Sequence, residues 1–443
     1  MRKLIFLFAM CAPILVNGQM IIREADSLHK HYAQKADELL VADSSLYSFF
    51  TIDLYGVSMF ASAEDKTRNK PEYKVNWSEL AIYKRMMANE PRELAIGIML
   101  DKGGRPFGRE VQKQYGEPAN REAVVFHPPM QPLVGYRIAI DPGHIANDTI
   151  IGKLEEKFIS MNIPAGTDST HVAFAEGQLT WQTAVLLAAR LRNYGAEVIF
   201  TRNGPGMTAF GKTFEQWKKD DYQRTLDSLL HDDPDNQNLK DIRSGKLKGD
   251  RAIFRFVFRD AELRKRAEII NAFQPHLTVA IHYNVDESNA PWSRPTNKNF
   301  CMLFVPGAFQ AGELSDSEKR FDFLRLLLLD DIGNSIAAST SVCAQFTARL
   351  NVKAANTSDA GYLSASCRKT GVQGIYARNL SMTRLVHGPI VFGETLYQDN
   401  VNEAAALSNM SITDRISGQQ TSKRVMQVAD AYFEGILQWV YKQ

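Results

Sequence analysis

The chain has few cysteines for its length, four among 443 residues. Cys11 lies in an apolar stretch near the N-terminus, and Cys301, Cys343 and Cys367 follow at irregular spacing. Three remaining cysteines at such spacing exclude a disulfide framework and a cysteine-based zinc site. A single bridge could form in an oxidising compartment, and the sequence does not choose its pair.

The chain also lacks an excess of charge of either sign. Lys and Arg total 52 against 50 Asp and Glu, which leaves a formal net charge of +2, and no run rich in Lys and Arg is present. This balance argues against a nucleic-acid partner. No apolar stretch after the N-terminal one reaches the length of a membrane span, so we expect no transmembrane anchor.

The N-terminus has the three parts of a secretory signal peptide. Met1 to Lys3 carries positive charge, Leu4 to Val16 is almost wholly apolar, and small and polar residues follow. The apolar part is too short to cross a bilayer, which favours a signal peptide over residues 1–18, with a buried helix as the alternative. The residue before Cys11 fits a lipoprotein cleavage site poorly. We therefore expect a free, exported product in the periplasm or secreted.

A proline cluster at residues 128–132 divides the mature chain, because proline suits neither a helix interior nor a central strand. We predict an N-terminal accessory domain over residues 19–130, a small α+β unit without a catalytic constellation. Residues 131–443 are predicted to form the catalytic domain. In the first part, the patterns indicate helices at residues 24–40 and 78–89 and strands within residues 47–60.

After the prolines, strands alternate with helices. Residues 179–194 have apolar positions at spacings of three and four, and Gly195 follows as a left-handed cap. Further strands are indicated at residues 136–140, 196–200, 277–282, 302–305, 374–377 and 389–392, and further helices at 264–273 and 422–441. This alternation predicts an α/β fold with a central sheet covered by helices on both faces. Two stretches, 204–249 and 312–333, interrupt it as insertions.

An amide is a poor electrophile and water at neutral pH is a poor nucleophile, so hydrolysis of an amide is slow unless both are activated. A zinc ion held by three protein groups lowers the pKa of its water to about 7 and polarises a carbonyl. A separate carboxylate then moves the proton to the leaving nitrogen. His144 and His282 come at strand ends, Glu176 begins a helix and Glu394 follows a late strand, positions that favour one sheet edge. A lone histidine at a strand end is nevertheless more often structural than a ligand.

The order of several motifs resembles that of the zinc-dependent N-acetylmuramoyl-L-alanine amidases. These motifs are IDPGH at 140–144, Glu176 before an Ala-rich helix, Thr201-Arg202, Arg266 with Asn271, AIHYN at 280–284 and VFGE at 391–394. The resemblance covers about residues 135 to 442. It implies zinc bound by His144, Glu176 and His282, with Glu394 as catalytic acid and base. It also implies a three-layer α/β/α domain with a mixed sheet.

The resemblance implies hydrolysis of the amide bond between N-acetylmuramic acid and L-alanine in peptidoglycan, by zinc-activated water. Such cleavage serves cell-wall remodelling or daughter-cell separation. Peptidoglycan, as a glycan strand with its stem peptide, is the expected partner, and a protein activator is a second. The alternatives are a zinc peptidase acting within the stem peptide and a non-catalytic peptidoglycan-binding or regulatory protein of the same fold. The presence of all four residues argues against the non-catalytic alternative.

This chain departs from the usual motif spacing. Glu176 comes 32 positions after His144, farther than is usual, and Ile145-Ala146 replace a Gly-Gly pair. The long connection contains His171, a rival ligand or a substrate contact, although a histidine in a surface loop is usually neither. Gly177 replaces a frequent lysine.

Other residues near these motifs have candidate roles. Asp141 is expected to accept a hydrogen bond from a ligand imidazole, or else to cap its turn. Arg266 and Asn271 are interpreted as structural, tying a helix to the sheet. His387 is a candidate for the cleft rim, with a structural role favoured. Arg378 is a candidate contact for an acidic group of the stem peptide, with a surface salt bridge as the default.

The insertion at residues 312–333 lies between His282 and Glu394 in sequence. It contains a capping-box pattern from Ser315 to Glu318, followed by a leucine run. Related division amidases have an occluding helix in a comparable region, which suggests a gating segment as a hypothesis. A plain packed helix explains the leucines as well.

Overall fold

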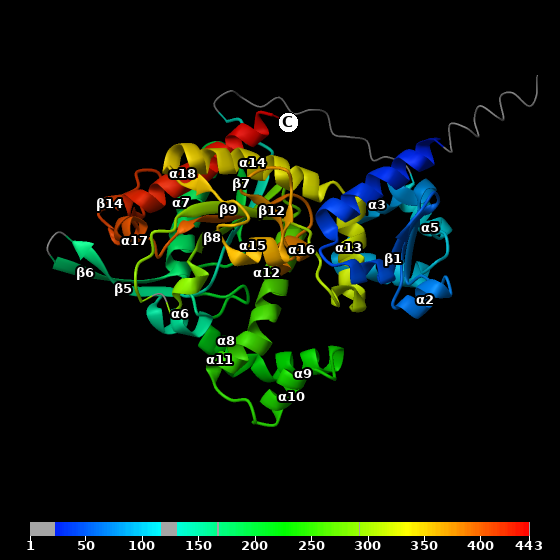
Figure 1. Ribbon diagram of the computed structural model, residues 1–443, viewed down its shortest axis with the longest axis horizontal. Coiled ribbons are helices and arrows are strands. Elements are labelled where there is room, and N and C mark those ends of the chain that lie inside the picture. Colours follow the sequence, from blue (N-terminus) through cyan, green and yellow to red (C-terminus); the bar gives the residue numbers. More distant parts are fainter. Residues whose placement is uncertain (1–22, 117–130, 166–167, 292, 443) are drawn as a thin grey trace, which may run out of the picture. The chain divides into compact units, whose positions relative to one another are not determined.

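The computed structural model describes residues 23–116, 131–165, 168–291 and 293–442 (Figure 1). The predicted signal peptide at residues 1–18 lies outside these ranges, as does most of the proline cluster. The described chain divides into two compact units: residues 23–116 with Gly307–Asp330, and residues 131–306 with 331–442. No helix within the described ranges is both long and apolar enough to cross a membrane.

The first unit combines a three-stranded antiparallel sheet with helices. Its strands lie in the order β1 (Phe50–Ile52), β2 (Gly56–Met59) and β3 (Tyr73–Asn76). A helix over residues 23–35 continues as a π-helix at Ala36–Leu40, close to the predicted helix. The remaining helices of residues 23–116 are α2 (Ala63–Thr67), α3 (Leu80–Asn89), α4 (Arg92–Lys102) and α5 (Arg109–Tyr115).

Helix α13 (Ser317–Leu328) belongs to this first unit, although the sequence analysis assigned it to the catalytic domain. Buried Arg92 donates to both carboxylate oxygens of Asp322 at 3.0 Å, and Arg320 Nε donates to Glu72 at 2.5 Å. Breaking a buried ion pair leaves an uncompensated charge in the interior and is strongly destabilising, so these contacts hold the helix in the first unit. They support the packed-helix interpretation of residues 312–333.

The N-cap of α13 is Asp316 and not the predicted Ser315. The Asp316 carboxylate accepts the backbone N–H of Lys319 at 3.0 Å, as an N-cap residue should. The hydroxyl of Ser315 instead donates to the carbonyl of Gly312 at 2.6 Å, within the preceding 3₁₀ turn. The helix therefore has its N-cap one residue later than the capping-box pattern predicts.

The second unit is built on an eight-stranded mixed sheet in the order β11-β12-β9-β13-β8-β4-β7, with β10 paired to β9. Strands β13, β8, β4 and β7 are mutually parallel, while β9 runs antiparallel to β13. The strands are β4 (Arg137–Pro142), β7 (Glu197–Phe200), β8 (Leu277–Asn284), β9 (Phe300–Val305), β10 (Lys353–Ala354), β11 (Arg368–Lys369), β12 (Ile375–Ala377) and β13 (Ile390–Tyr397).

Helices cover both faces of this sheet, and each face has its own buried core (Figure 1). One face packs on α7 (Glu176–Asn193), α14 (Asp331–Leu350) and α18 (Lys423–Val440). The other packs on α12 (Arg259–Phe273), α15 (Gly361–Ser366) and α16 (Ser381–Leu385). The predicted three-layer α/β/α architecture with a mixed sheet is confirmed.

Smaller elements of the second unit are α17 (Val401–Ser408), β14 (Ile412–Thr413) and β15 (Gln420–Thr421).

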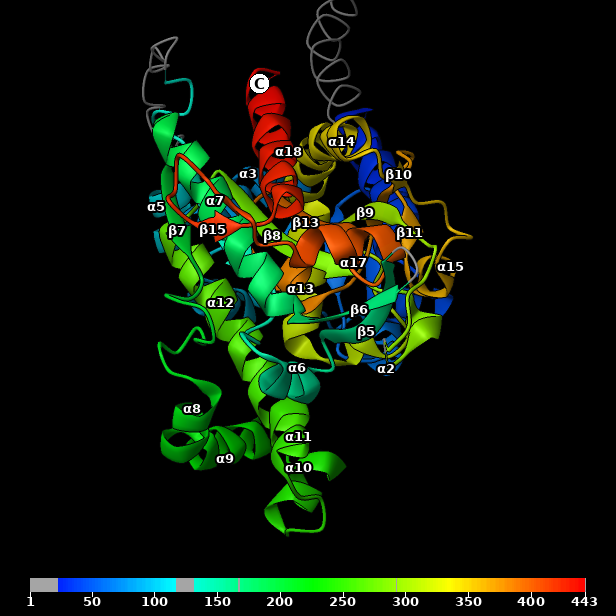
Figure 2. The ribbon, with the colours of Figure 1, turned by 90° about the vertical axis from the view of Figure 1, so that its left-hand side faces the viewer.

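The insertion that follows β7 is helical and has its own core. Helices α8 (Phe214–Asp220), α9 (Tyr222–Asp232), α10 (Gln237–Arg243) and α11 (Asp250–Ile253) gather beyond the end of α12 (Figure 2). Phe214, Trp217, Phe254 and Phe258 pack together inside it. Ile145, the residue after His144, belongs to the same buried cluster.

Candidate active site

Three of the predicted residues converge on one point. One ligand atom each from His144, Glu176 and His282 lies within 4.8 Å of the others. Glu176 Oε1 is 3.5 Å from His144 Nε2 and 3.2 Å from His282 Nδ1. The imidazole rings are 5.0 Å apart and nearly perpendicular. Two nitrogens and one carboxylate oxygen, facing each other, form a donor set that suits zinc.

The turn that carries His144 is held by two buried arginines. Strand β4 ends at Pro142, whose carbonyl accepts Arg202 Nε and Arg266 Nη1, each at 3.2 Å. His144 then adopts a left-handed backbone with φ of 56°. A non-glycine residue rarely adopts this conformation, so the contacts of the two arginines with the turn are needed to hold it. The backbone of the turn then sets the direction of the imidazole.

His282 projects from β8 and is enclosed by aromatic and backbone groups. Its ring stacks on Phe392 at 4.5 Å with an interplanar angle of 11°. On its other side, a Cβ built at Gly143 would lie 2.2 Å from His282 Cε1. Glycine is therefore required at position 143, because the imidazole occupies the space of a side chain there.

Glu176 begins α7 and is 1% exposed. Its Oε1 accepts the backbone N–H of Tyr283, and its Oε2 accepts Gln398 Nε2, both at 3.1 Å. Burial raises the pKa of the Glu176 carboxyl, but nearby His144, Lys157 and His282 outweigh burial and hold the pKa well below its usual value. The carboxylate is therefore ionised and preorganised.

Helix α7 approaches the His144 turn closely at Gly177. A Cβ built at Gly177 would lie 2.4 Å from the carbonyl oxygen of Ala146. Glycine stands here in place of a frequent lysine, and this close contact with the backbone of Ala146 explains it. The small residue lets the helix bring Glu176 up to the imidazoles.

Glu394 lies beside His282 in the parallel register of β13 and β8. The prediction placed it after the strand, but β13 extends to Tyr397. Burial raises the pKa of the Glu394 carboxyl, and negative Glu176 adds to the rise. In the described ranges, no lysine or arginine forms an ion pair with Glu394 or Glu176. Two neighbouring carboxylates without such a partner suit a bound cation.

Glu155 is a site residue that the sequence analysis missed. It ends α6 (Thr149–Glu155), and its Oε1 lies 3.6 Å from His144 Nδ1. The same carboxylate accepts the backbone N–H groups of Ile145 at 3.1 Å and Ala146 at 2.8 Å. Burial raises the pKa of Glu155, but His144 and these N–H groups outweigh burial and lower the pKa overall. A carboxylate there faces the histidine nitrogen that points away from Glu176.

Of the two roles expected for Asp141, that of acceptor for a ligand imidazole is wrong, and that of support for the turn agrees with its contacts. Asp141 Oδ1 accepts the Thr201 hydroxyl at 2.6 Å and Arg266 Nη1 at 3.2 Å, so it supports the turn instead of an imidazole. The structural interpretation of Asn271 agrees with its contacts. Its Nδ2 donates to the Leu385 carbonyl and its Oδ1 accepts the His387 N–H, both at 2.9 Å.

His171 and His387 lie apart from the converging residues. His171 lies on β6 (Asp168–Ala175), which pairs with β5 (Phe158–Ala165), and its Nδ1 contacts Asn162 Oδ1 at 3.0 Å. It is absent from the group of possible metal ligands among the described residues. His387 comes before Ile390, the first residue of β13, whereas Glu394 lies in the second half of that strand.

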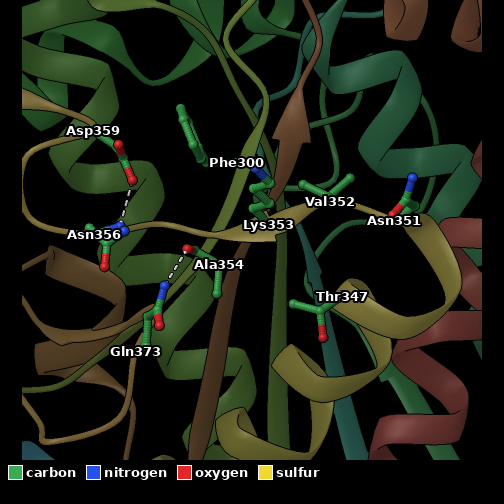
Figure 3. Close-up of a pocket in the computed structure, with 9 residues that line it drawn as sticks. All are labelled: Phe300, Thr347, Asn351, Val352, Lys353, Ala354, Asn356, Asp359 and Gln373. Atoms are coloured by element: carbon green, nitrogen blue, oxygen red, sulfur yellow. Dashed lines mark hydrogen bonds between the residues drawn. The ribbon is translucent and has the colours of Figure 1, made fainter.

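A hollow of about 560 Å³ lies where β10 pairs with the start of β9 (Figure 3). Its lining includes Phe300, Lys353 and Asn351, and the Gln373 amide donates to the Ala354 carbonyl at 3.0 Å. None of the residues in the converging group lines this hollow. The candidate chemistry therefore lies elsewhere, over β8 and β13.

The mixed three-layer sheet and the converging His–Glu–His group beside a half-buried carboxylate define a hydrolase with a site suited to a metal ion. The sequence profile of the family described as N-acetylmuramoyl-L-alanine amidase matches residues 138–422. The chain belongs to this family, which confirms the resemblance drawn from the motifs. It is therefore an amidase that hydrolyses the bond between N-acetylmuramic acid and L-alanine in peptidoglycan.

Solved structures similar to this chain are also amidases, at low identity. Ami1 of Mycobacterium abscessus shares 16% identity over 69% of this chain and 99% of its own, with a TM-score of 0.35. The CwlD amidase of Clostridioides difficile, solved with the GerS lipoprotein, shares 13% identity over 70% and 100%, with a TM-score of 0.37. AmiC2 of Nostoc punctiforme shares 14% over 70% and 99%, with a TM-score of 0.33. A search of curated proteins gave no match.

Proposed function

We propose that the amidase reaction depends on zinc held by His144 Nε2, Glu176 Oε1 and His282 Nδ1. The convergence of these three atoms beside Glu394, which forms no ion pair with a described lysine or arginine, is the observation that carries the proposal. When bound there, zinc supplies Lewis acidity that polarises a carbonyl and makes water a better nucleophile.

Glu394 is the proposed general base and acid. Its raised pKa matters, because a base with a pKa nearer neutrality transfers protons more effectively at neutral pH. Glu394 takes the proton of the attacking water and delivers it to the departing L-alanine nitrogen. Tyr283 and Gln398 hold Glu176 in place, and its lowered pKa keeps its carboxylate from competing for this proton.

The decisive experiment treats intact sacculi with the purified protein and identifies the released material by mass spectrometry. Free stem peptides that begin at L-alanine are the expected product. Shortened peptides would instead identify a peptidase acting within the stem, and no release under any metal condition would indicate a binding protein. Activity lost on chelation and restored by zinc, more than by magnesium or calcium, is expected.

Glu155→Gln is expected to weaken zinc binding about ten- to hundredfold, the usual cost of losing the outer partner of a metal-bound histidine. The reason is that Glu155 faces His144 Nδ1 and sets the orientation of the ring and the basicity of its other nitrogen. Competition with a chromophoric chelator measures the zinc dissociation constant directly.

Glu156→Gln is the matched control, since Glu156 is adjacent in sequence but half-exposed, paired with Arg251. Glu155→Asp should recover part of the affinity if the charge matters. Equal zinc affinity in Glu155→Gln and the wild type would reduce Glu155 to a support for the backbone of Ile145 and Ala146.

We also propose that residues 131–306 and 331–443 act as the catalytic domain and that the first unit is an accessory domain. Export to the periplasm or exterior follows from the location of peptidoglycan. Fractionation of cells, with N-terminal sequencing of the mature protein, tests both export and cleavage near residue 18. Release of the protein only with the cytoplasmic fraction would contradict export.

A further inference from the structure

A row of aromatic rings, one stacked pair followed by two tilted pairs, leads away from the candidate site on the α12 face of the sheet. His282 stacks on Phe392, whose ring centroid is 6.1 Å from that of Phe304. Phe304 in turn lies 6.3 Å from Tyr362, which belongs to α15. The Arg378 guanidinium lies over the last two rings, 4.9 Å from Phe304 and 4.5 Å from Tyr362. The positive charge of Arg378 therefore contacts the same row of aromatic rings as His282.

Arg378 is fixed at its backbone. Its N–H donates to the Val305 carbonyl at 3.0 Å, and its carbonyl accepts the Thr383 hydroxyl at 2.9 Å. Tyr362 is fixed as well, because its hydroxyl accepts Asn284 Nδ2 at 3.0 Å. The guanidinium itself is held by its contacts with the rings of Phe304 and Tyr362, so it loses less side-chain freedom on binding a ligand.

No carboxylate pairs with Arg378 in the described part of the chain. Its guanidinium forms no ion pair or hydrogen bond with any described residue, although five N–H donors are available. The side chain is half-buried, so its donors face solvent or a ligand. The default interpretation from the sequence, a surface salt bridge, therefore does not hold. Aromatic faces satisfy the charge in part but leave the donor edge open.

Arg378 also lies close to the proposed reacting groups. It acts on the carboxyl of Glu394 and on the hydroxyl of Tyr362, lowering the pKa of each against the opposing effect of burial. Two extended residues of a peptide span about 7 Å. A carboxylate on the residue after L-alanine therefore lies about 7 Å or less from a scissile bond placed at Glu394.

We infer that Arg378 is a specificity-determining residue that binds a carboxylate of the stem peptide, the α-carboxylate of the D-glutamate that follows L-alanine. The guanidinium fork matches a carboxylate with two parallel hydrogen bonds, and the rings beneath it hold the fork in place. The inference rests on the proposed function, since it takes the scissile amide to lie beside Glu394.

The test compares two muramoyl peptides that differ at one group. One carries D-glutamate with its free α-carboxylate, and the other carries D-isoglutamine, in which that group is an amide. The wild type is expected to cleave the free acid with a kcat/KM about ten- to hundredfold higher, because a hydrogen bond to a charged group is lost in the amide. Equal kcat/KM for the two substrates would overturn the inference.

Arg378→Gln should remove this preference mainly through a higher KM for the free acid, with the amidated peptide little affected. Arg378→Lys should recover part of the preference, as a charge without the fork. Arg349→Gln is the matched control, because Arg349 is a half-exposed surface arginine on α14 paired with Glu434. An equal loss on both substrates in Arg378→Gln would mean a structural role.

The outcomes separate this inference from the proposed function. If neither muramoyl peptide releases a peptide beginning at L-alanine, while intact sacculi are also untouched, the proposed function fails. If both are cleaved equally well, the amidase stands and the assignment of Arg378 is wrong.

Discussion

Glu394→Gln is expected to lower kcat by about a thousandfold while zinc remains bound at one ion per chain, because general acid–base catalysis contributes about 10²–10⁴-fold. Gln has nearly the shape of Glu but cannot accept and return a proton. Glu394 is not among the three converging ligand atoms, so its loss leaves that donor set intact. Turnover on sacculi and zinc content by elemental analysis measure the two effects separately.

Glu268→Gln controls for the removal of one negative charge, since Glu268 is exposed and paired with Lys265. It should match the wild type in both assays. Substantial residual turnover in Glu394→Gln would remove Glu394 from its role, and loss of zinc together with turnover would make it a ligand instead.

Glu176→Gln is expected to abolish both zinc binding and turnover. Its Oε1 faces both imidazoles, and it is the only carboxylate of the converging set. Replacing it with a neutral amide removes the charge that favours a divalent ion, and with it Lewis acidity worth several kcal/mol, at least about a thousandfold in rate.

Thermal unfolding distinguishes this result from misfolding. A ligand that binds only the folded state raises Tm with its concentration, so zinc should raise the Tm of the wild type and of Glu394→Gln. Glu176→Gln should unfold cooperatively without a shift on zinc addition. A zinc-dependent rise equal to that of the wild type would show that the ion is held elsewhere.

The periodic parts of the fold could be predicted from the sequence. The apolar repeat at residues 179–194 predicts most of α7, and the apolar runs before His282 and Glu394 predict β8 and β13. The runs end early because both strands continue through residues such as Asn284 and Thr395, whose polar groups are paired within the fold. A continuous apolar run reveals a strand only as far as both of its faces are apolar.

Long-range pairing could not be predicted. Arg92 and Asp322 are far apart in the sequence, and their ion pair, with that of Arg320 and Glu72, joins α13 to the first unit. Asp141 was expected to support an imidazole because it lies in the motif, but Thr201 and Arg266 compete for it successfully. Glu155 has no motif, since its approach to His144 depends on the course of α6.

The helical insertion after β7 bears on any attempt to shorten this enzyme. Ile145 is 2% exposed, and it belongs to the hydrophobic cluster of Trp217 and Phe254 directly beside His144. A shortened enzyme lacking residues 204–258 would expose Ile145 to water and loosen the backbone that orients the His144 imidazole. The insertion therefore stabilises the turn that carries His144, and a shortened enzyme has to retain it or replace the apolar contacts of Ile145.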